Sequence, residues 1–365
     1  EHLKDPFDWR RPELGTPYWR ARFHPDKPGE IVSLYDRSED RWVNSGHLNQ
    51  LQGFNDKPPV CEPWEMTADM FENPADIFSH TTQEVIADGP LIFVVRATYE
   101  GASSKLVQDV RFYAHSPRID FVTWVDWHER RKILKVAFPL RIASNVSWAE
   151  TAYGHQSNPM TRDTLAEEAR FETPMHRWVA LTDGDYGVAL LNDSKYGYDG
   201  LHDTLRLTLL KSAGHAQIDP DYDSLNPLKT VERPAAWADQ GKHEFSYSLW
   251  PFKGDVATGG VLREARLLNS PLHAINGNAE VAPLIHIDNP NIIAETLKEA
   301  EDGDGVVLRL YEASGSDSSA TLRLTMDFGA WQECDLLEHP LHAQGGPGNI
   351  TLDFHRFEIK TIRFT

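Results

Sequence analysis

Polar and aromatic side chains follow an apolar run at residues 189–199, and this part of the sequence is best suited to binding chemistry. Ala-Leu-Leu leads directly into Asn192, Asp193, Lys195 and Tyr196. A buried strand that ends in such groups presents them together at its end, where ligands are commonly bound. The mixture favours a sugar ligand, with Asp193, Lys195 and Tyr196 as substrate-binding residues. In the alternative, the tyrosines pack at the end of the strand and Lys195 is solvated.

A second candidate binding segment is rich in amide side chains. Residues 49–59 read Asn-Gln-Leu-Gln-Gly-Phe-Asn-Asp-Lys-Pro-Pro. Amide groups both donate and accept hydrogen bonds, which matches the hydroxyl groups of a sugar. We therefore expect Asn49, Gln50 and Gln52 to bind substrate. A turn in which these amides bond to the backbone explains the composition equally well.

No catalytic residue is assigned. Glycoside hydrolysis needs two carboxylates at a set separation in space, which a sequence with 55 acidic residues does not specify. Glu62 with Glu65 and Asp193 with Asp199 are candidate pairs, but each is more typical of a solvated loop end. The sequence contains no Gly-x-Ser-x-Gly elbow, no phosphate-binding glycine loop and no Cys/His nucleophile pattern.

The sequence also predicts no metal site in this chain. His286 and Asp288 are two residues apart and would project from the same face of a strand, but two ligands are too few for zinc. They are better explained as the solvated edge of a strand. Cys61 and Cys334 are far apart and have no metal-ligand spacing, so both are expected to be free thiols.

Composition and charge exclude several classes of partner. The formal net charge of −19 repels phosphate backbones and anionic lipids, so neither nucleic acid nor a membrane is an expected partner. No apolar run is long enough to cross a bilayer. The first residues lack the basic and apolar regions of a signal peptide, which favours a cytoplasmic location, and the missing Met suggests that the sequence begins inside a longer one.

Alternation with a period of two dominates the chain and predicts an all-β fold. Residues 118–142 are expected to form a β-hairpin, because two alternating runs flank a polar turn at 128–131. Residues 205–209 and 245–249 also alternate, whereas 91–95 and 188–191 resemble strands buried on both faces.

Helical periodicity is nearly absent. Its best candidate is residues 291–301, which run into Asp-Gly-Asp-Gly and then an apolar segment at 306–310. A hairpin across this glycine turn fits at least as well as a helix followed by a strand. At 365 residues, the chain is expected to form a sandwich, either single or double.

Breaks in the pattern divide the chain into three parts. Residues 1–20 have no period and suit a linker or a packed arm. A loop-like stretch at 268–278 separates a large β-sandwich, residues 21–270, from a small C-terminal β-domain, residues 271–365. Residues 218–239 are acidic and proline-rich and are expected to form a long surface loop.

Several separated blocks resemble the C-terminal region of glycoside hydrolase family 38, the α-mannosidases. The likeness runs from about Tyr18 to the C-terminus and is strongest with the cytosolic and bacterial branch. The blocks are residues 31–36, 49–56, 119–138 with Trp-Val-Asp-Trp-His-Glu-Arg at 124–130, 169–172, 176–178, 189–199, 239–249 and 357–362.

The resemblance implies a large mutarotase-like antiparallel β-sandwich, or supersandwich, followed by a smaller C-terminal β-domain. It also implies that the parent enzyme hydrolyses terminal α-mannosides with retention, using zinc and a carboxylate nucleophile. In the family, both groups belong to α/β and helical domains, whose His-x-Asp-aromatic and His-His-Asp motifs are not found here. The chain would then pack on these domains of the same polypeptide, contribute loops to the rim of the cleft, hold no cofactor of its own and be inactive alone.

Two other classes of function stay open. A stand-alone carbohydrate-binding or mutarotase-like module would need its own sugar cleft. A purely structural module that forms homo-oligomers would need no sugar site.

Overall fold

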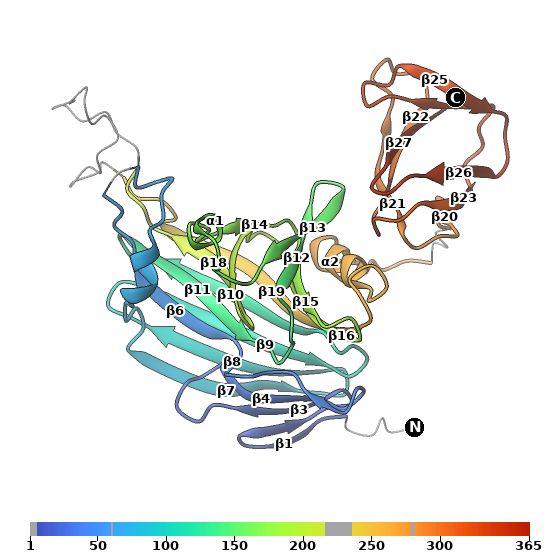
Figure 1. Cartoon of the computed structure of the whole chain (residues 1–365). Helices are drawn as coiled ribbons and strands as arrows, with labels where there is room; N and C mark the ends of the chain where they lie inside the picture. Colours follow the sequence, from blue (N-terminus) through green and yellow to red (C-terminus); the bar gives the residue numbers. More distant parts are fainter. Residues whose placement is uncertain (1–5, 60, 216–235, 279–281) are drawn as a thin grey trace, which may run out of the picture. The chain divides into compact units, whose positions relative to one another are not determined.

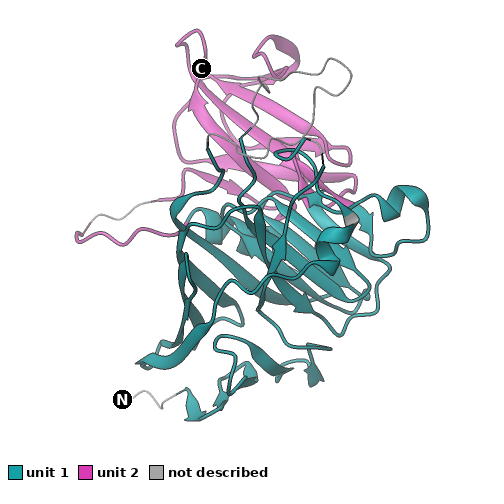
Figure 2. Cartoon of the chain, turned by 90° about the vertical axis from the view of Figure 1, so that its left-hand side faces the viewer, with its two compact units in different colours: residues 1–149, 157–255, 259–270 teal, residues 150–156, 256–258, 271–365 magenta. Residues whose placement is uncertain are grey.

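A computed structural model of the chain describes residues 6–59, 61–215, 236–278 and 282–365 (Figure 1). The chain divides into two compact units (Figure 2). Unit 1 comprises Glu1–Ala149, Ser157–Asp255 and Gly259–Ser270, and unit 2 comprises Glu150–Gln156, Val256–Thr258 and Pro271–Thr365. Antiparallel strands dominate both units, which confirms the predicted all-β fold. The loop predicted for residues 218–239 lies almost entirely outside the described residues.

The largest sheet has nine strands. Its central strands are apolar on one or both faces, and β16 is buried along its whole length, as predicted. In spatial order the strands are β13 (Gly154–Pro159), β12 (Val146–Thr151), β15 (Trp178–Thr182), β16 (Tyr186–Asn192), β19 (Gly241–Lys253), β10 (Ile119–Trp127), β9 (Lys105–Tyr113), β8 (Ile92–Glu100) and β7 (His80–Asp88).

Two five-stranded sheets complete unit 1. The first sheet is β1 (Asp8–Arg10), β2 (Glu13–Gly15), β3 (Trp19–Phe23), β4 (Ile31–Asp36) and β5 (Arg41–Trp42). The second sheet is β14 (Thr173–Pro174), β17 (Gly197–Leu201), β18 (Thr204–Lys211), β11 (Lys132–Pro139) and β6 (Gln50–Asn55).

Both five-stranded sheets pack on the same face of the large sheet. The ring of Phe23 in the first sheet lies 6.1 Å from that of Phe112, and the ring of Phe138 in the second sheet lies 5.6 Å from that of Phe121. Phe112 opposes Ile119 in register, so it shares a face with Phe121, two residues further along β10. The buried side chains of the three sheets form one continuous core, in which the hydrophobic effect stabilises unit 1.

The predicted hairpin at residues 118–142 is wrong in its pairing, although both strands exist. β10 belongs to the nine-stranded sheet and β11 to the second five-stranded sheet, and Arg131, with a φ of 49°, lies in the connection between them. The two strands face each other across the core through Phe121 and Phe138 instead of pairing at their edges. Each strand has a strongly apolar face, and alternation alone does not distinguish stacking from edge pairing.

Of the two alternatives predicted for residues 1–20, a linker or a packed arm, the described part fits the packed arm. This segment supplies β1, β2 and the start of β3, and Phe7, Leu14 and Trp19 are buried in the main core. The strands β1 and β2 have only three residues each, so they are too short to show a period in the sequence.

Unit 2 has its own core, formed by side chains such as Leu308, Leu322 and Ile362. Residues 292–299 pair with 306–312, so the hairpin alternative predicted here is confirmed. One sheet consists of β20 (Ile285–Ile287), β23 (Ser318–Leu324) and β26 (Ile350–Phe354); the other consists of β21 (Ile292–Glu299), β22 (Val306–Glu312), β27 (Ile359–Phe364), β24 (Trp331–Cys334) and β25 (Pro340–Gly345).

Helices are short throughout the described residues. They are the 3-10 helix η1 (Ala68–Glu72), α1 (Leu165–Glu168) and α2 (Val261–Asn269). The sequence did not predict α2, which follows a glycine pair and buries Val261, Glu264 and Ala265. Within the part of the chain that the structure describes, none of these helices has the length and apolar character needed to span a bilayer.

Candidate functional site

The outer face of the second five-stranded sheet carries a cluster of charged side chains. Along β11, Leu134, Val136 and Phe138 point into the core, so Lys135 projects from the opposite face. On β18, Arg206 and Thr208 take the same outward positions between core leucines. Register brings these residues side by side, because Lys135 opposes Thr208 across the two strands.

Lys135 is the centre of this outer cluster and is fully buried. Its Nζ atom donates to Glu172 Oε2 at 2.6 Å, to Thr208 Oγ1 at 2.7 Å and to Asp199 Oδ2 at 2.8 Å. The three hydrogen bonds use the full donor capacity of an ammonium group. Asp199 accepts a second charged partner, since the guanidinium of Arg206 lies 2.6 Å from its Oδ1.

Two members of the outer cluster reach solvent. The side chains of Glu172 and Arg206 are 24% and 17% exposed. The ring of Phe71, from η1, lies 4.5 Å below the guanidinium carbon of Arg206 and 5.9 Å from Lys135 Nζ. The buried ion pairs and this ring therefore hold a carboxylate and a guanidinium in fixed positions at the surface.

Gln50 and Gln52 extend the polar face onto β6. In register, Gln52 opposes Lys135 and Gln50 opposes Ala137, so both amides lie on the outer face. Gln50 donates to the carbonyl of His47 at 2.6 Å. Gln52 Oε1 is buried and has no hydrogen-bond partner among the described residues. An orphaned acceptor on a polar face is the kind of group that a bound ligand or a neighbouring domain satisfies.

A second polar cluster lies where β6 and β18 end. Glu62 binds Arg131 through two hydrogen bonds of 3.1 Å, and it also accepts from the backbone N–H of Gly214 at 2.8 Å. Lys211 Nζ donates to the carbonyl of Glu65 at 2.6 Å and lies 3.6 Å from Asp56 Oδ2. These contacts fix the segment that follows β6 against the end of β18.

Asp56 is the unsatisfied member of this end cluster. It is 1% exposed, and neither carboxylate oxygen has a hydrogen-bond partner among the described residues. Burial raises the pKa of Asp56 to about 6, and the positive charge of Lys211 only partly offsets this effect. A buried carboxylate with a raised pKa beside a polar loop is a typical property of a functional site.

The structure corrects the prediction that Asn49 binds substrate. Asn49 is fully buried, and its Nδ2 donates to the carbonyl of Gly29 at 2.9 Å and to Gln108 Oε1 at 2.7 Å. Its Oδ1 accepts from the Tyr247 hydroxyl at 2.7 Å. Its φ of 60° is a left-handed conformation that asparagine tolerates better than most residues. Asn49 is therefore a core residue with no polar group left for a ligand.

The other predicted segment turns sharply after β16. Asn192 is buried and accepts from the Lys195 backbone N–H at 2.7 Å, while Asp193 accepts from the Ser246 N–H at 2.9 Å. Lys195 Nζ lies 4.3 Å from the centre of the Phe245 ring, and burial lowers its pKa. Tyr196 is 57% exposed. Asp193 and Lys195 thus have local structural contacts, and Tyr196 has the ring most open to a ligand.

The two predicted segments are not brought together as one site. β6 is at one edge of the second five-stranded sheet, whereas Tyr196 directly precedes β17, which is separated from β6 by the strands β18 and β11. No hydrogen bond joins Gln50 or Gln52 to the segment 193–196 in the part of the chain that the structure describes. The outer cluster around Lys135 lies between them.

Sequence reasoning missed this outer cluster. Lys135 and Arg206 were visible as charged positions on otherwise apolar alternating strands, but such positions usually face water. Glu172 lies outside any strand, so no pattern marked it. The candidate acid pairs are explained structurally, because Glu62 is bound to Arg131 and Asp199 to Lys135.

No metal site is formed by the residues that the structure describes. They contain no group of three or more His, Cys, Asp or Glu side chains able to hold an ion. His286 is exposed on β20, and Asp288 accepts from the Thr321 N–H at 2.7 Å. Cys61 and Cys334 are free, as predicted.

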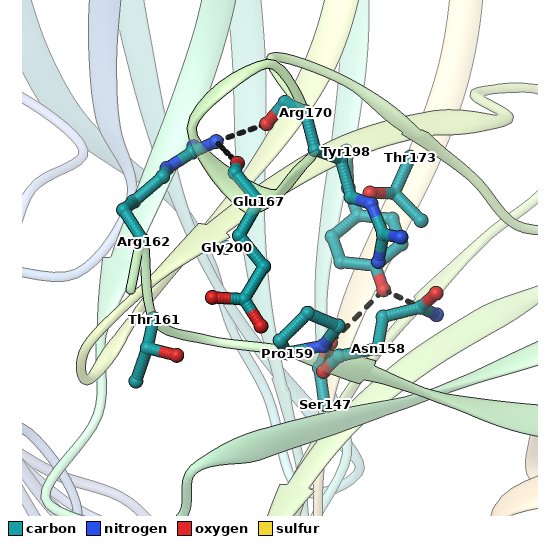
Figure 3. Close-up of a pocket in the computed structure, with 10 residues that line it drawn as sticks. All are labelled: Ser147, Asn158, Pro159, Thr161, Arg162, Glu167, Arg170, Thr173, Tyr198 and Gly200. Carbon is teal, nitrogen blue, oxygen red and sulfur yellow. Dashed lines mark hydrogen bonds between the residues drawn. The ribbon is translucent and has the colours of Figure 1, made fainter. Parts of the chain in front are cut away.

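A separate pocket beside β17 is too small for a sugar. Figure 3 shows the Tyr198 hydroxyl between Ser147 and Asn158, at 2.9 and 3.1 Å, with Arg162 donating to the carbonyls of Glu167 and Arg170. Its free volume is about 10 Å³. This is room for about one water molecule.

Comparison with solved structures defines the class of protein first. An α-mannosidase from Enterococcus faecalis V583 has the same fold, with a TM-score of 0.75 over 97% of this chain and 42% of that one, at 15% identity. The predicted combination of a large antiparallel β-sandwich and a smaller C-terminal β-domain is thereby confirmed.

Sequence comparison then identifies the family. Residues 14–240 match the glycosyl hydrolases family 38 C-terminal domain, and residues 291–362 match the family 38 C-terminal β-sandwich domain. The chain belongs to glycoside hydrolase family 38. It is 32% identical to α-mannosidase G of Dictyostelium discoideum and 33% identical to human α-mannosidase 2C1, in each case over 92% of this chain and 31% of the relative. The chain thus spans about a third of the length of these relatives.

Proposed function

We propose that this chain is the β-domain portion of a retaining, zinc-dependent α-mannosidase that hydrolyses terminal α-mannosides. The observation that carries the proposal is the match of both units to the C-terminal domains of family 38, together with relatives named α-mannosidase that are about three times longer. The catalytic carboxylate and the zinc belong, in this proposal, to α/β and helical domains of the same polypeptide.

The polar face of the second five-stranded sheet is the surface that meets the catalytic domain and the substrate cleft. Its exposed charged groups are held in fixed positions, because Lys135 and Asp199 bind Glu172 and Arg206 from below the surface. A rigid polar surface of this kind positions hydrogen bonds to a partner without a further entropic cost. Gln52, whose side-chain oxygen has no hydrogen-bond partner among the described residues, is on β6. Asp56, whose carboxylate is also unsatisfied there, is the residue that follows this strand.

Residues at the rim contact the mannoside or the neighbouring domain. Gln50 and Gln52 extend from β6, and Glu172 and Arg206 are the exposed groups of the outer cluster. Tyr196 offers an exposed ring, while Asp193 and Lys195 hold the turn on which it lies. Asn49 supports this surface from within the core and does not contact the sugar.

The wider setting follows from the same proposal. The enzyme is cytoplasmic, with a carbohydrate substrate, and the β-domains provide the surface through which any homo-oligomer forms. Neither nucleic acid nor a membrane is a partner.

Three experiments test the proposal. The purified 365-residue chain should not release 4-nitrophenol from 4-nitrophenyl α-mannoside, and the coding sequence upstream of Glu1 should encode an α/β region with the zinc-binding motifs. In that longer enzyme, Glu172→Gln or Arg206→Gln should lower kcat/KM about tenfold to a hundredfold.

The matched control is Asp88→Asn, which changes an exposed carboxylate on the edge strand β7 and should leave kcat/KM unchanged. Turnover by the isolated chain, an upstream sequence without these motifs, or equal effects of Glu172→Gln and Asp88→Asn would each overturn the proposal.

A further inference from the structure

The outer face of the first five-stranded sheet carries a row of side chains that crosses all five strands. Asp8, Gly15, Arg20, Tyr35 and Trp42 are successive register partners from β1 to β5. Partners in an antiparallel sheet project from the same face. The neighbouring row of Leu14, Ala21 and Leu34 is buried in the core, so the row from Asp8 to Trp42 faces outward. Figure 1 shows β1, β3 and β4 of this sheet.

Four residues of this row, all but Tyr35, line an open groove of about 410 Å³. Its size lies within the range of small-ligand sites. The absent side chain of Gly15 leaves space in the row between Asp8 and Arg20. Seven groups able to contact a ligand line the groove: Asp8, Arg10, Glu13, Arg20, Arg22, Ser33 and Trp42.

The aromatic end of the groove is held in place. Trp42 is 44% exposed, and its ring meets that of Tyr35 edge-on at 5.1 Å. The guanidinium of Arg20 lies 4.2 Å from the centre of the Tyr35 ring. These contacts fix the indole, whose exposed apolar face is available to pack against the C–H face of a pyranose ring.

The charged part of the groove matches a neutral, hydroxyl-rich ligand. Arg10, Arg20 and Arg22 are nearly balanced by Asp8 and Glu13, with Arg10 and Asp8 paired at 3.0 Å. Neither a polyanion nor a polycation fits such alternation. The neighbouring guanidinium and carboxylate groups are planar donors and acceptors, and together they can bond to adjacent hydroxyl groups of a sugar.

We propose that this groove is a non-catalytic binding site for a neutral oligosaccharide, with Trp42 as the stacking platform and Arg20, Arg22 and Glu13 as the hydroxyl-binding groups. The choice of α-linked mannose as the sugar rests on the proposed function. The groove and the polar face belong to different sheets of unit 1. The groove would therefore hold a part of the substrate chain that does not lie on the polar face.

Binding is tested with the 365-residue chain by affinity electrophoresis in gels containing yeast α-mannan and by calorimetry with an α-linked mannotriose. The wild-type chain should be retarded by mannan. Trp42→Ala and Arg22→Gln should each weaken binding at least tenfold, because both remove a group that contacts the ligand. Unchanged circular dichroism and Tm would show that both variants fold.

The matched control is Trp64→Ala, which removes another exposed indole, 70% exposed, from the segment that follows β6. It should bind mannan like the wild type. Absence of retardation, equal loss in Trp42→Ala and Trp64→Ala, or retardation by dextran sulfate alone would overturn the proposal. So would a change in elution volume of Trp42→Ala on size exclusion, since this would assign the face to self-association.

The assay separates this inference from the proposed function. Mannan binding needs neither zinc nor turnover, so α-mannosidase activity without binding in this groove would sink the inference alone. Binding by a chain whose longer form lacks α-mannosidase activity would overturn only the proposed function.

Discussion

The ammonium group of Lys135 lies 2.8 Å from the carboxylate of Asp199, and neither side chain has more than 1% of its surface exposed. The pair joins β11 to β17 across the intervening strand β18, which supplies Thr208 and Arg206. Taking two charges out of water is costly, and only good geometry with further hydrogen bonds compensates for it. The pair therefore fixes the polar face but leaves the unit sensitive to the loss of either charge.

Replacement of Lys135 by methionine should destabilise the chain by about 3 to 5 kcal/mol, because the carboxylates of Asp199 and Glu172 lose their shared donor. Urea unfolding followed by tryptophan fluorescence measures this loss. The control is Lys105→Met, which breaks an ion pair with Glu100 whose side chains are about half exposed. Because that pair is exposed, its loss should cost far less stability than the loss of Lys135. Similar losses in the two variants would contradict the structural role of Lys135.

Asp56 should make the stability of unit 1 depend on pH. Its pKa of about 6 in the folded chain is above its ordinary value of 3.8, so the folded state binds its proton more tightly than the unfolded state does. Below pH 4 the group is protonated in both states and costs nothing. As the pH rises through 6 the folded state loses this advantage, and stability falls by about 3 kcal/mol at most.

Asp56→Asn removes this titration with little change in shape. The free energy of unfolding of the variant minus that of the wild type should therefore rise between pH 4 and pH 8, by about 2 to 3 kcal/mol. Urea unfolding at several pH values measures the difference and cancels the contributions of other groups. If this difference in the free energy of unfolding stays constant or falls with pH, the Asp56 carboxylate is stabilised by a hydrogen-bond partner in solution.

The alternation of apolar residues predicted several core strands, such as those at residues 205–209 and 245–249, because a strand with one face in the core leaves a direct record in the sequence. Pairing was harder to predict. The strands that contain Phe121 and Phe138 are consecutive, yet they face each other across the core, since both have an apolar face to bury. The strand that contains Leu14 was missed because it has only three residues and is too short to repeat its pattern.

The candidate site was only partly visible in the sequence for a different reason. An amide that binds a sugar and one that satisfies a buried backbone carbonyl have the same letter, and Asn49 proved to be the second kind. Lys135 appeared at a position that normally faces water, and only the approach of Glu172 and Phe71 from distant loops buries it. Such contacts between distant segments have no local signal.

The buried network around Asn49 should contribute to stability and not to activity. Tyr247→Phe removes the donor to Asn49 Oδ1 and the acceptor for Gln108 Nε2, so two buried groups lose a partner. We expect a loss of about 1 to 3 kcal/mol in urea unfolding. In an active enzyme that contains this chain, kcat/KM measured well below the Tm should be unchanged. A fall in kcat/KM at full folding would return Asn49 to the binding site.

The purified chain should hold less than one zinc ion per molecule after dialysis, because its described residues assemble no set of three ligands. Mass spectrometry of the dialysed protein measures the metal content. The variant His286→Ala tests the nearest sequence candidate. One equivalent of zinc in the wild type that is lost in this variant would contradict the structural explanation of His286 and Asp288.

The rim residues provide the sharpest test of the role proposed for this chain in an α-mannosidase. In the longer enzyme, Gln50→Ala and Tyr196→Phe should each lower kcat/KM about tenfold to a hundredfold, because each removes a hydrogen bond that is shielded from water once substrate is bound. The Tm should change little, since Tyr196 is 57% exposed and the Gln50 side chain, among the described residues, is bonded only to neighbouring groups on its own segment. Steady-state kinetics with 4-nitrophenyl α-mannoside and thermal unfolding of the same preparations measure the two quantities. If activity falls only in proportion to lost stability, these residues have a packing role, and if neither variant changes kcat/KM, the rim of this sheet does not reach the active site.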